Sequence, residues 1–341
     1  MTGTAVVDED RLSEAVLGAA QSSPTPFSSA TAVSLRRLQG GYSGITYTVE
    51  VDLPGQPETI VVKAAPPGLE PVKNRDVLRQ AAMIGALGGT SIPVPKLLFI
   101  SRGGNDVPPF YATEFVAGEA YEPIFDGPGR CSDDEIRSRS LEGALLLARL
   151  HQVDLGTLPF DTGPEVTPTD EVDRWARAFT TLPEDLQGNG PELGRALAAH
   201  PPEPMEPVLV HGDYRLGNMI ATGGSIRAVL DWEIWSRSDP RMDVTWFITQ
   251  ADARSHPLAC WQPPGMPSPE TLVATYEGER GETVGPLGWF AALVRFKVAA
   301  TSALIVKHNR SAPTPDPGRS KWEPGIAPLL HDGLRILEEG S

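Results

Sequence analysis

The stretch Val208-Leu-Val-His211-Gly-Asp213-Tyr-Arg-Leu-Gly-Asn218, followed by Ala228-Val-Leu-Asp231-Trp-Glu233, decides which fold and chemistry to expect of this 341-residue chain. It contains H-x-D-x-x-x-x-N, the spacing of a kinase catalytic loop, and then an aspartate at the end of a second apolar run. On such a loop the aspartate faces an attacking hydroxyl, and the asparagine holds a metal ion that bridges nucleotide phosphates. The pattern therefore indicates phosphoryl transfer.

Each polar residue of this stretch has a candidate role. Asp213 is the candidate base, or the group that orients the hydroxyl, and His211 is expected to brace the loop. Asn218 and Asp231 are candidate Mg²⁺ ligands, because this ion prefers a few carboxylate or amide oxygens together with phosphate oxygens. Glu233 either approaches the metal or is a structural carboxylate. An ordinary turn is the alternative for the whole motif, but its position between two strand-like runs favours the catalytic interpretation.

Lys63 ends the strand-like run Thr59-Ile-Val-Val-Lys63. A lysine that points inward from a buried strand is costly unless it meets a negative partner, and phosphate oxygens would supply one. An exposed lysine at a strand end is the alternative. Further along the chain, backbone groups of Glu114 and Val116 are expected to face an adenine edge, an assignment that rests on their position between two predicted lobes.

A glycine-rich segment, Leu38-Gln-Gly-Gly41-Tyr-Ser43-Gly44-Ile-Thr-Tyr47, precedes that lysine. Backbone amides at Gly41 and Gly44, with the hydroxyl of Ser43, are expected to cover the phosphates, because glycine permits close approach. A hairpin turn explains the same residues equally well. The order of the segments along the chain gives the phosphate-binding assignment its weight.

The predicted elements change character along the chain. The first third holds a helix at 8–20 capped by Asp8, a helix at 77–87, and strand-like segments at 33–38, 47–53, 59–64, 93–100 and 110–116. After Gly118 the patterns are helical, at 134–152, 171–179, 192–199, 269–277, 287–308 and 328–339. This order predicts an α+β fold of two lobes: a nucleotide-binding lobe at 1–117 and a catalytic, substrate-binding lobe at 118–341.

The charge balance excludes one class of partner. The chain has 44 acidic and 29 basic residues, a net charge of −15, whereas non-specific binding to nucleic acid needs a basic surface. An acidic surplus keeps a protein soluble, but it is also compatible with a cationic acceptor. For that case Asp170, Glu171 and Asp173 are tentative substrate ligands.

Composition and cysteine usage suggest a cytoplasmic protein. Hydrophobic residues make up 40% and charged residues 21%, as in ordinary globular proteins. No segment is expected to span a membrane, since the apolar stretch Leu141–Leu150 is interrupted by Glu142 and Arg149. The first residues lack the pattern of a secretory signal. The two cysteines, Cys131 and Cys260, are too few for a metal cluster and fit a reducing cytosol; the oligomeric state is not indicated.

These residues resemble the aminoglycoside phosphotransferase family, whose protein-kinase-like fold joins an N-terminal lobe with an antiparallel sheet and a helix to a mainly helical C-terminal lobe. The resemblance runs from about Leu35 to about Ile248. Its segments are Gly41-Tyr-Ser-Gly44, Val61-Val-Lys63, Pro93-Val-Pro95, Phe110-Tyr-Ala-Thr-Glu-Phe-Val116, His211–Asn218, Leu230-Asp-Trp-Glu233 and Ser238-Asp-Pro-Arg-Met-Asp243. The Asp-Trp-Glu form is most similar to the branch that includes kinase-like domains of some acyl-CoA dehydrogenases.

The resemblance implies that Asp213 contacts the substrate hydroxyl, that Asn218 and Asp231 bind Mg²⁺, and that Lys63 binds the phosphates of ATP. One position departs from the family. A glutamate on the N-lobe helix usually pairs with the strand lysine, and that position here is Gln80. An amide at this position is able to hydrogen-bond the lysine but not to neutralise it.

The leading hypothesis is a small-molecule kinase that moves the γ-phosphate of ATP or GTP, with Mg²⁺, to a hydroxyl group. Its acceptor is an antibiotic of aminoglycoside, macrolide or nucleoside type, or a metabolite. The alternative is a nucleotide-binding pseudoenzyme that acts as a binding module, against which the intact set of Asp213, Asn218 and Asp231 argues. A protein kinase fits less well, because no Ala-Pro-Glu motif or long activation segment follows Asp231.

Overall fold

The structure is a computed structural model that describes residues 7–38, 44–70, 72–104, 106–158, 165–256, 258–259 and 261–339. The chain divides into two compact units. The N-terminal unit comprises Met1–Glu119, Thr157–Pro159 and Arg227–Ile234, and the C-terminal unit comprises Ala120–Gly156, Phe160–Ile226 and Trp235–Ser341. The segment around Asp231 thus folds with the N-terminal strands. The lobe boundary at residue 117 stays a prediction.

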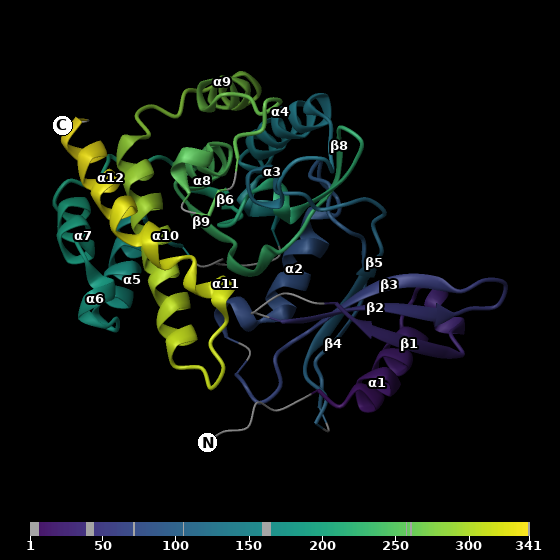
Figure 1. Ribbon diagram of the computed structural model, residues 1–341. Helices are drawn as coiled ribbons and strands as arrows, with labels where there is room; N and C mark the ends of the chain where they lie inside the picture. The colour runs from purple at the N-terminus through teal and green to yellow at the C-terminus, as the bar shows by residue number, and fades with distance from the viewer. Residues whose placement is uncertain are drawn as a thin grey trace. The chain divides into compact units, whose positions relative to one another are not determined.

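A five-stranded antiparallel sheet forms the centre of the N-terminal unit, with the strand order β1-β2-β3-β5-β4 (Figure 1). Its strands are β1 (Ala32–Arg37), β2 (Ile45–Asp52), β3 (Glu58–Ala64), β4 (Leu97–Ser101) and β5 (Phe110–Glu114). The predicted hairpin of β2 and β3 is confirmed. β4 begins at Leu97 rather than at Pro93, because Pro93 and Pro95 have no N–H to donate to a ladder.

Two helices pack with this sheet. Asp8 caps α1 (Glu9–Gln21) by accepting a hydrogen bond from the backbone N–H of Arg11, as predicted. The apolar face of α1 places Leu12, Val16 and Ala20 in a core shared with β2 and β3, where all three are fully buried. α2 (Val77–Leu87) contacts β4, β5 and the short 3-10 turn η5 (Trp232–Ile234). The turn after Asp231 is therefore anchored to the N-terminal unit.

The C-terminal unit is mainly helical, as predicted. Its helices are α3 (Pro123–Asp126), α4 (Asp133–Leu150), α5 (Pro168–Thr180), α6 (Glu184–Gln187), α7 (Gly190–Ala199), α8 (Arg241–Gln250), α9 (Pro269–Arg280), α10 (Gly288–Arg310), α11 (Pro317–Ser320) and α12 (Ile326–Glu339). β6 (Val208–Val210) pairs with β9 (Ser236–Ser238) next to the predicted catalytic loop. β7 (Met219–Thr222) and β8 (Ser225–Val229) lead from that loop to Asp231.

α10 corrects one expectation. By length and composition this helix is long and apolar enough to cross a membrane. No segment with these properties was expected from the sequence. In the structure 61% of its apolar window is buried inside the protein. Its apolar side chains share a core with α5, α7 and α12, with Phe296 stacked on Phe179 at 5.0 Å between ring centroids. This packing is typical of the core helix of a globular domain.

Candidate active site

Lys63, at the end of β3, meets two carboxylates within the N-terminal unit. Its Nζ lies 2.7 Å from Oδ1 of Asp231 and 3.7 Å from Oε2 of Glu233, and its side chain is only 12% exposed. Burial acts to lower the pKa of Lys63, but Tyr111 and these carboxylates outweigh it, so that the pKa is raised. Lys63 is therefore a buried, charged lysine and not an exposed lysine at a strand end.

Asp231 has an unusual backbone conformation. Its φ is 63°, in the left-handed region that few residues other than glycine adopt. Trp232, fully buried beside it, donates from Nε1 to the carbonyl of Val229 at 3.0 Å and fixes the turn. The Asp231 carboxylate is 39% exposed. Backbone strain of this kind is found where a side chain must be presented in one direction.

Gln80 does not hydrogen-bond Lys63. Its Nε2 donates to the carbonyl of Asn74 at 3.0 Å, and its Oε1 is buried with no hydrogen-bond partner among the described residues. Asp76, one turn earlier, caps α2. The second carboxylate beside Lys63 thus comes from Glu233, a residue for which the sequence left the role open.

The predicted nucleotide-covering segment is only partly described. Gly41 and Ser43 lie outside the described residues. At Gly44 an added Cβ would come within 3.1 Å of both the Ala64 carbonyl and Cε of Lys63, so a larger residue would crowd that lysine. The N–H of Glu114 donates to the Lys96 carbonyl at 3.0 Å.

Val116, the second residue expected at an adenine edge, lies beyond the end of β5 and is half-buried. Among the described residues its backbone makes no recorded hydrogen bond. The assignment of Val116 to an adenine edge stays a prediction, whereas the N–H of Glu114 is already bonded.

In the C-terminal unit, three donors hold the carboxylate of Asp213. Trp246 Nε1 donates to Oδ1 at 2.9 Å, while Asn218 Nδ2 and Arg215 Nε donate to Oδ2 at 2.8 Å and 3.3 Å. The carboxylate is 27% exposed and so remains open to a ligand. Asn218 turns its amide nitrogen to Asp213, which leaves its amide oxygen with no hydrogen bond to another described residue.

A buried carboxylate fixes the backbone of this loop. Asp243, on α8, accepts from the backbone N–H of His211 at 2.6 Å and of Gly212 at 2.8 Å. Burial acts to raise the pKa of Asp243, but the contacts with His151 and His211 outweigh it and lower the pKa. His211 in turn accepts a hydrogen bond at Nδ1 from the backbone N–H of Asp213 at 3.2 Å. The charged carboxylate of Asp243 therefore fixes the backbone of the predicted catalytic loop.

The ring of Trp246 also makes a cation–π contact. The ammonium group of Lys297, on α10, lies 4.2 Å from the centre of the Trp246 ring and donates to the Gly212 carbonyl at 3.1 Å. Trp246 thus joins the predicted catalytic aspartate to a fixed positive charge.

Replacing Trp246 with phenylalanine is expected to lower kcat about tenfold, because a hydrogen bond to a charged group is lost while the ring under Lys297 stays. The KM for nucleotide should change little. Trp289→Phe is the matched control, since its Nε1 donates to the Leu197 carbonyl, away from Asp213. Steady-state kinetics with a validated acceptor test this, and equal kcat in both variants would contradict the positioning role.

Glu122 is a site residue that sequence reasoning missed. Its Oε2 accepts from the backbone N–H of Gly217 at 2.8 Å and from Arg215 at 3.3 Å, so it supports both Asn218 and the guanidinium beside Asp213. Burial raises the pKa of Glu122 to about 7, and the attraction of Arg215 only partly opposes the shift. Nothing in its sequence context marks it as different from other glutamates.

The pH dependence of stability should report on Glu122. Between its ordinary pKa of 4.5 and about 7 the folded protein binds more protons at this group than the unfolded chain, so stability falls as pH rises through that range. The loss is at most about 3 kcal/mol. Glu122→Gln should remove this part of the profile, as measured by chemical denaturation across pH. Exposed Glu206→Gln should keep it, and a wild-type profile in Glu122→Gln would show that Glu122 stays charged.

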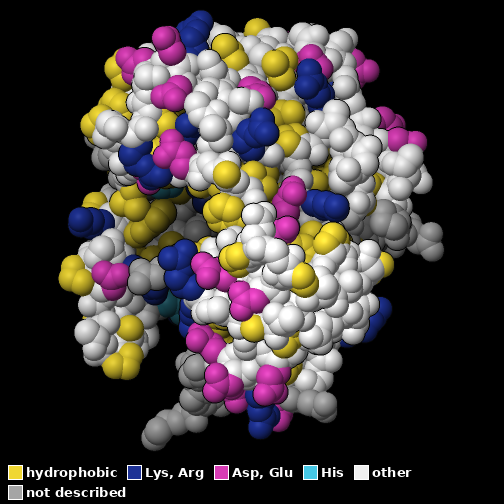
Figure 2. Space-filling view, turned by 90° about the vertical axis from the view of Figure 1, so that its right-hand side faces the viewer, with side chains coloured by type: hydrophobic (Ala, Val, Ile, Leu, Met, Phe, Trp, Pro, Cys, Tyr) yellow, Lys and Arg dark blue, Asp and Glu magenta, His cyan; other side chains and the backbone are white. Residues whose placement is uncertain are grey.

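Of the three acids expected to bind a cationic acceptor, two have other contacts. Asp170 forms the capping box of α5 with the N-cap residue Thr167, whose hydrogen bonds lower the pKa of Asp170. Glu171 is buried and accepts from Trp175 Nε1 at 2.8 Å and from Arg174 at 3.0 Å. Asp173 is exposed. Figure 2 shows acidic side chains spread over one face of the molecule with basic ones among them, a distribution that solubility alone explains.

Sequence comparisons connect the chain with phosphotransferases. The family model described as "Phosphotransferase enzyme family" matches residues 34–261. Acyl-CoA dehydrogenase family member 11 of Gallus gallus is 27% identical over 332 residues, which are 91% of this chain and 41% of that protein. Member 10 of Mus musculus is 26% identical over 222 residues, 63% of this chain and 20% of that protein. The chain thus spans less than half the length of these relatives.

Solved structures share the fold. A Ralstonia eutropha JMP134 protein, a candidate aminoglycoside phosphotransferase, has a TM-score of 0.75 at 21% identity, covering 97% of this chain and 98% of that one. A macrolide 2'-phosphotransferase type I has 0.56 at 18%, covering 97% and 98%. An aminoglycoside phosphotransferase with bound ADP and hygromycin B has 0.57 at 16%, covering 91% and 95%. The predicted α+β, protein-kinase-like fold is confirmed, and the chain belongs to the phosphotransferase enzyme family.

Proposed function

We propose that this protein is a Mg²⁺-dependent kinase that moves the γ-phosphate of ATP or GTP to a hydroxyl group of a small molecule. The observation that carries the proposal is the carboxylate of Asp213, held by three donors on a loop that Asp243 fixes, yet still open to solvent. Phosphoryl transfer depends on positioning and on neutralising charge more than on covalent chemistry by the protein. A fixed carboxylate provides the positioning.

The nucleotide is assigned to the N-terminal unit. Lys63 is buried and charged, and it already faces carboxylates that a phosphate group would replace or join. A fixed ammonium group stabilises the negative charge on phosphate oxygens. Solved relatives with bound ADP and with AMP-PNP support a nucleotide at this fold. The choice between ATP and GTP is left to experiment.

Asn218 and Asp231 are proposed as Mg²⁺ ligands from the chemistry of their side-chain oxygens. The ion is usually bound through one or two protein oxygens, with phosphate oxygens and waters completing its shell. Here the amide oxygen of Asn218 makes no hydrogen bond to a described residue, and the Asp231 carboxylate is 39% exposed. No cluster of three or more His, Cys, Asp or Glu side chains suited to a metal lies within the described residues. When bound, the ion would neutralise charge on the phosphates.

Asp213 is proposed to orient the acceptor hydroxyl and to take its proton as the bond to phosphorus forms. Hydrogen bonds from Trp246, Asn218 and Arg215 fix the orientation of the carboxylate. We therefore expect Asp213 to bind the hydroxyl in the ground state and to hold it toward the phosphate. His211 and Asp243 act on the loop and do not touch the acceptor.

A nucleotide-binding module without activity is the competing function. Measurements of nucleotide turnover by the wild type, with and without Mg²⁺ and with panels of hydroxylated antibiotics and metabolites, separate the two. Acceptor-dependent ADP or GDP release supports the kinase. Tight nucleotide binding with no acceptor-dependent release in any panel supports the module.

A further inference from the structure

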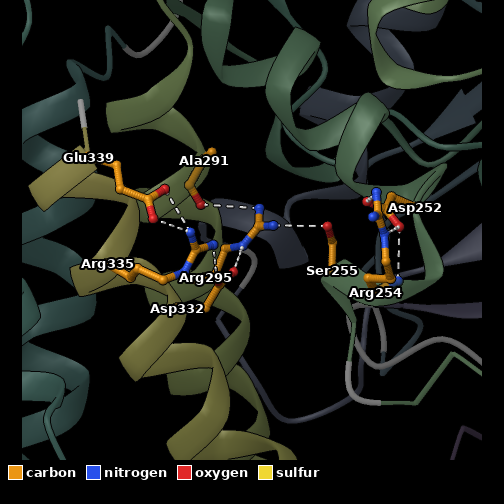
Figure 3. A network of polar contacts seen from close by, with 8 residues as sticks. All are labelled: Asp252, Arg254, Ser255, Ala291, Arg295, Asp332, Arg335 and Glu339. Atoms are coloured by element: carbon orange, nitrogen blue, oxygen red, sulfur yellow. Dashed lines mark hydrogen bonds and ion pairs between the residues drawn. The ribbon is translucent and has the colours of Figure 1, made fainter.

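A cavity of about 660 Å³ lies wholly within the C-terminal unit. Small-molecule sites usually have volumes between about 300 and 1,000 Å³. Its walls come from residues 252–256 after α8, from α10, from the segment between α11 and α12, and from α12 itself. Figure 3 shows two groups of charged side chains in this region: Arg254 with Asp252, and Arg295 and Arg335 with Asp332 and Glu339, with Ser255 reached by Arg295.

The lining of this cavity has a net positive charge, whereas the whole chain has a net negative charge. The lining includes four basic side chains and two acidic ones: Arg254, Arg295, Lys321, Arg335, Asp252 and Asp332. The chain as a whole has 29 basic and 44 acidic residues. The lining therefore has two more basic than acidic side chains, a balance that favours a ligand of negative charge.

Part of the positive charge is held rigidly. Arg295 donates from Nε to Asp332 at 3.0 Å, from Nη2 to the Ser255 hydroxyl at 2.9 Å and from Nη1 to the Ala291 carbonyl at 3.4 Å. A guanidinium has five N–H donors, so two of them remain for a ligand. The side chain is only 11% exposed and is thus oriented before anything binds.

Arg335 is paired with Asp332 at 2.6 Å and with Glu339 at 2.7 Å, whereas the other two cations are accessible. Arg254 pairs with Asp252 at 2.9 Å, but its side chain is 87% exposed. Lys321 is exposed, and its ammonium group makes no recorded contact with another described residue. Pro324, Pro328 and Leu329 add apolar surface between these cations. A rigid guanidinium, a mobile ammonium and an apolar floor suit an organic molecule that ends in an oxyanion.

One wall of the cavity packs against Phe125 of α3. His256 lines the cavity, and its ring contacts Phe125 and Trp322 at 4.5 Å and 5.4 Å between centroids. Burial and the charge of Arg215 lower the pKa of His256 to about 4, so His256 is neutral near pH 7. Arg215 is also the residue that bonds Asp213. The N–H of Phe125 donates to the Glu122 carbonyl at 3.0 Å, and the Glu122 carboxylate holds Arg215 and Gly217, so packed residues connect this wall to the catalytic loop.

We infer that this cavity binds a carboxylate or phosphate group of the acceptor, so that the substrate of the proposed kinase is an anionic hydroxyl compound. The claim that this anionic group belongs to the acceptor rests on the proposed function. Anion binding by the cavity rests on its lining residues alone. A polycationic acceptor would meet repulsion from Arg254, Arg295 and Lys321. Asp170, Glu171 and Asp173 are not among the lining residues.

Calorimetric titration with inorganic phosphate and with acetate tests the inference. The titrations use Lys63→Ala protein, so that phosphate near the nucleotide site does not contribute. In that background, the added pair Arg254→Gln and Lys321→Gln should weaken anion binding at least about tenfold, because charge-assisted contacts are lost. Arg137→Gln, an exposed arginine of α4, is the matched control and should not change it.

Saturable binding of either phosphate or acetate supports the inference. Binding of phosphate alone assigns a phosphate-bearing acceptor, and binding of acetate assigns a carboxylate-bearing one. The inference is overturned if neither anion saturates the Lys63→Ala protein, or if the paired substitution leaves the affinity unchanged. Because the readout is binding, absence of kinase activity would remove the proposed function without removing the anion site.

Discussion

Asp213→Asn is expected to lower kcat by about 10²- to 10⁴-fold, the range for loss of a positioned acid–base group. The asparagine keeps the shape of the side chain, but it loses the charge that holds Arg215 and the oxygen that accepts the hydroxyl proton. Nucleotide affinity should change little, since the phosphates are assigned to the other unit. We therefore expect Asp213→Asn to lower kcat and to leave the dissociation constant for nucleotide nearly unchanged.

Two measurements separate these effects. Nucleotide titration calorimetry should give similar dissociation constants for wild type and variant, while initial rates with a validated acceptor should differ by the factor above. Asp173→Asn is a suitable control, because Asp173 is exposed on α5. Near-native turnover in Asp213→Asn would remove Asp213 from the mechanism.

Asp231→Asn is expected to weaken Mg²⁺-dependent nucleotide binding at least about tenfold and to lower kcat further. Asparagine tolerates the left-handed backbone conformation that Asp231 adopts, whereas alanine would add strain. The variant therefore isolates the loss of charge. It also removes the 2.7 Å ion pair with Lys63, so the nucleotide phosphates become that lysine's main partner.

Nucleotide titrations at several Mg²⁺ concentrations measure the effect. Asp231→Asn should flatten the dependence of affinity on Mg²⁺, because a metal ligand has lost its charge. Glu233→Gln is the control: it alters the second carboxylate near Lys63, at 3.7 Å, and should change affinity without changing the Mg²⁺ dependence. An unaltered Mg²⁺ dependence in Asp231→Asn would exclude it as a metal ligand.

Short motifs predicted much of the fold and of the candidate site. The spacing from His211 to Asn218 places its residues on one loop, and local chain geometry is enough for that inference. The strand lysine and the aspartate after β8 come together in the structure although 168 positions separate them. The family resemblance implied a separate role for each residue, at the phosphates and at Mg²⁺, and did not predict this ion pair, since composition and periodicity carry no information on long-range contacts.

Buried polar residues explain what the sequence did not predict. α8 has no amphipathic pattern, because Arg241, Asp243, Thr245, Thr249 and Gln250 are all buried. Its apolar positions therefore lack the helical period that reveals a surface helix. Two of the residues that hold the catalytic loop, Asp243 and Trp246, lie on this helix.

The sequence also did not predict side-chain contacts that depend on tertiary structure. Gln80 was expected near Lys63 from its place on α2, but Glu233 occupies that position after the tight turn at Asp231. A turn of that kind depends on one left-handed residue, which leaves no pattern in the chain. Glu122 is likewise defined by its burial and by two contacts from the catalytic loop.

Direct detection of phosphate transfer tests the central claim. Wild type and Asp213→Asn would be incubated with ATP or GTP, Mg²⁺ and pooled hydroxyl compounds of neutral, cationic and anionic type, and products would be identified by mass spectrometry. The proposed function predicts a compound that gains one phosphate with the wild type, only with Mg²⁺, and far less with Asp213→Asn. A wild type that binds nucleotide but phosphorylates no compound, or a product formed equally well by Asp213→Asn, would contradict it.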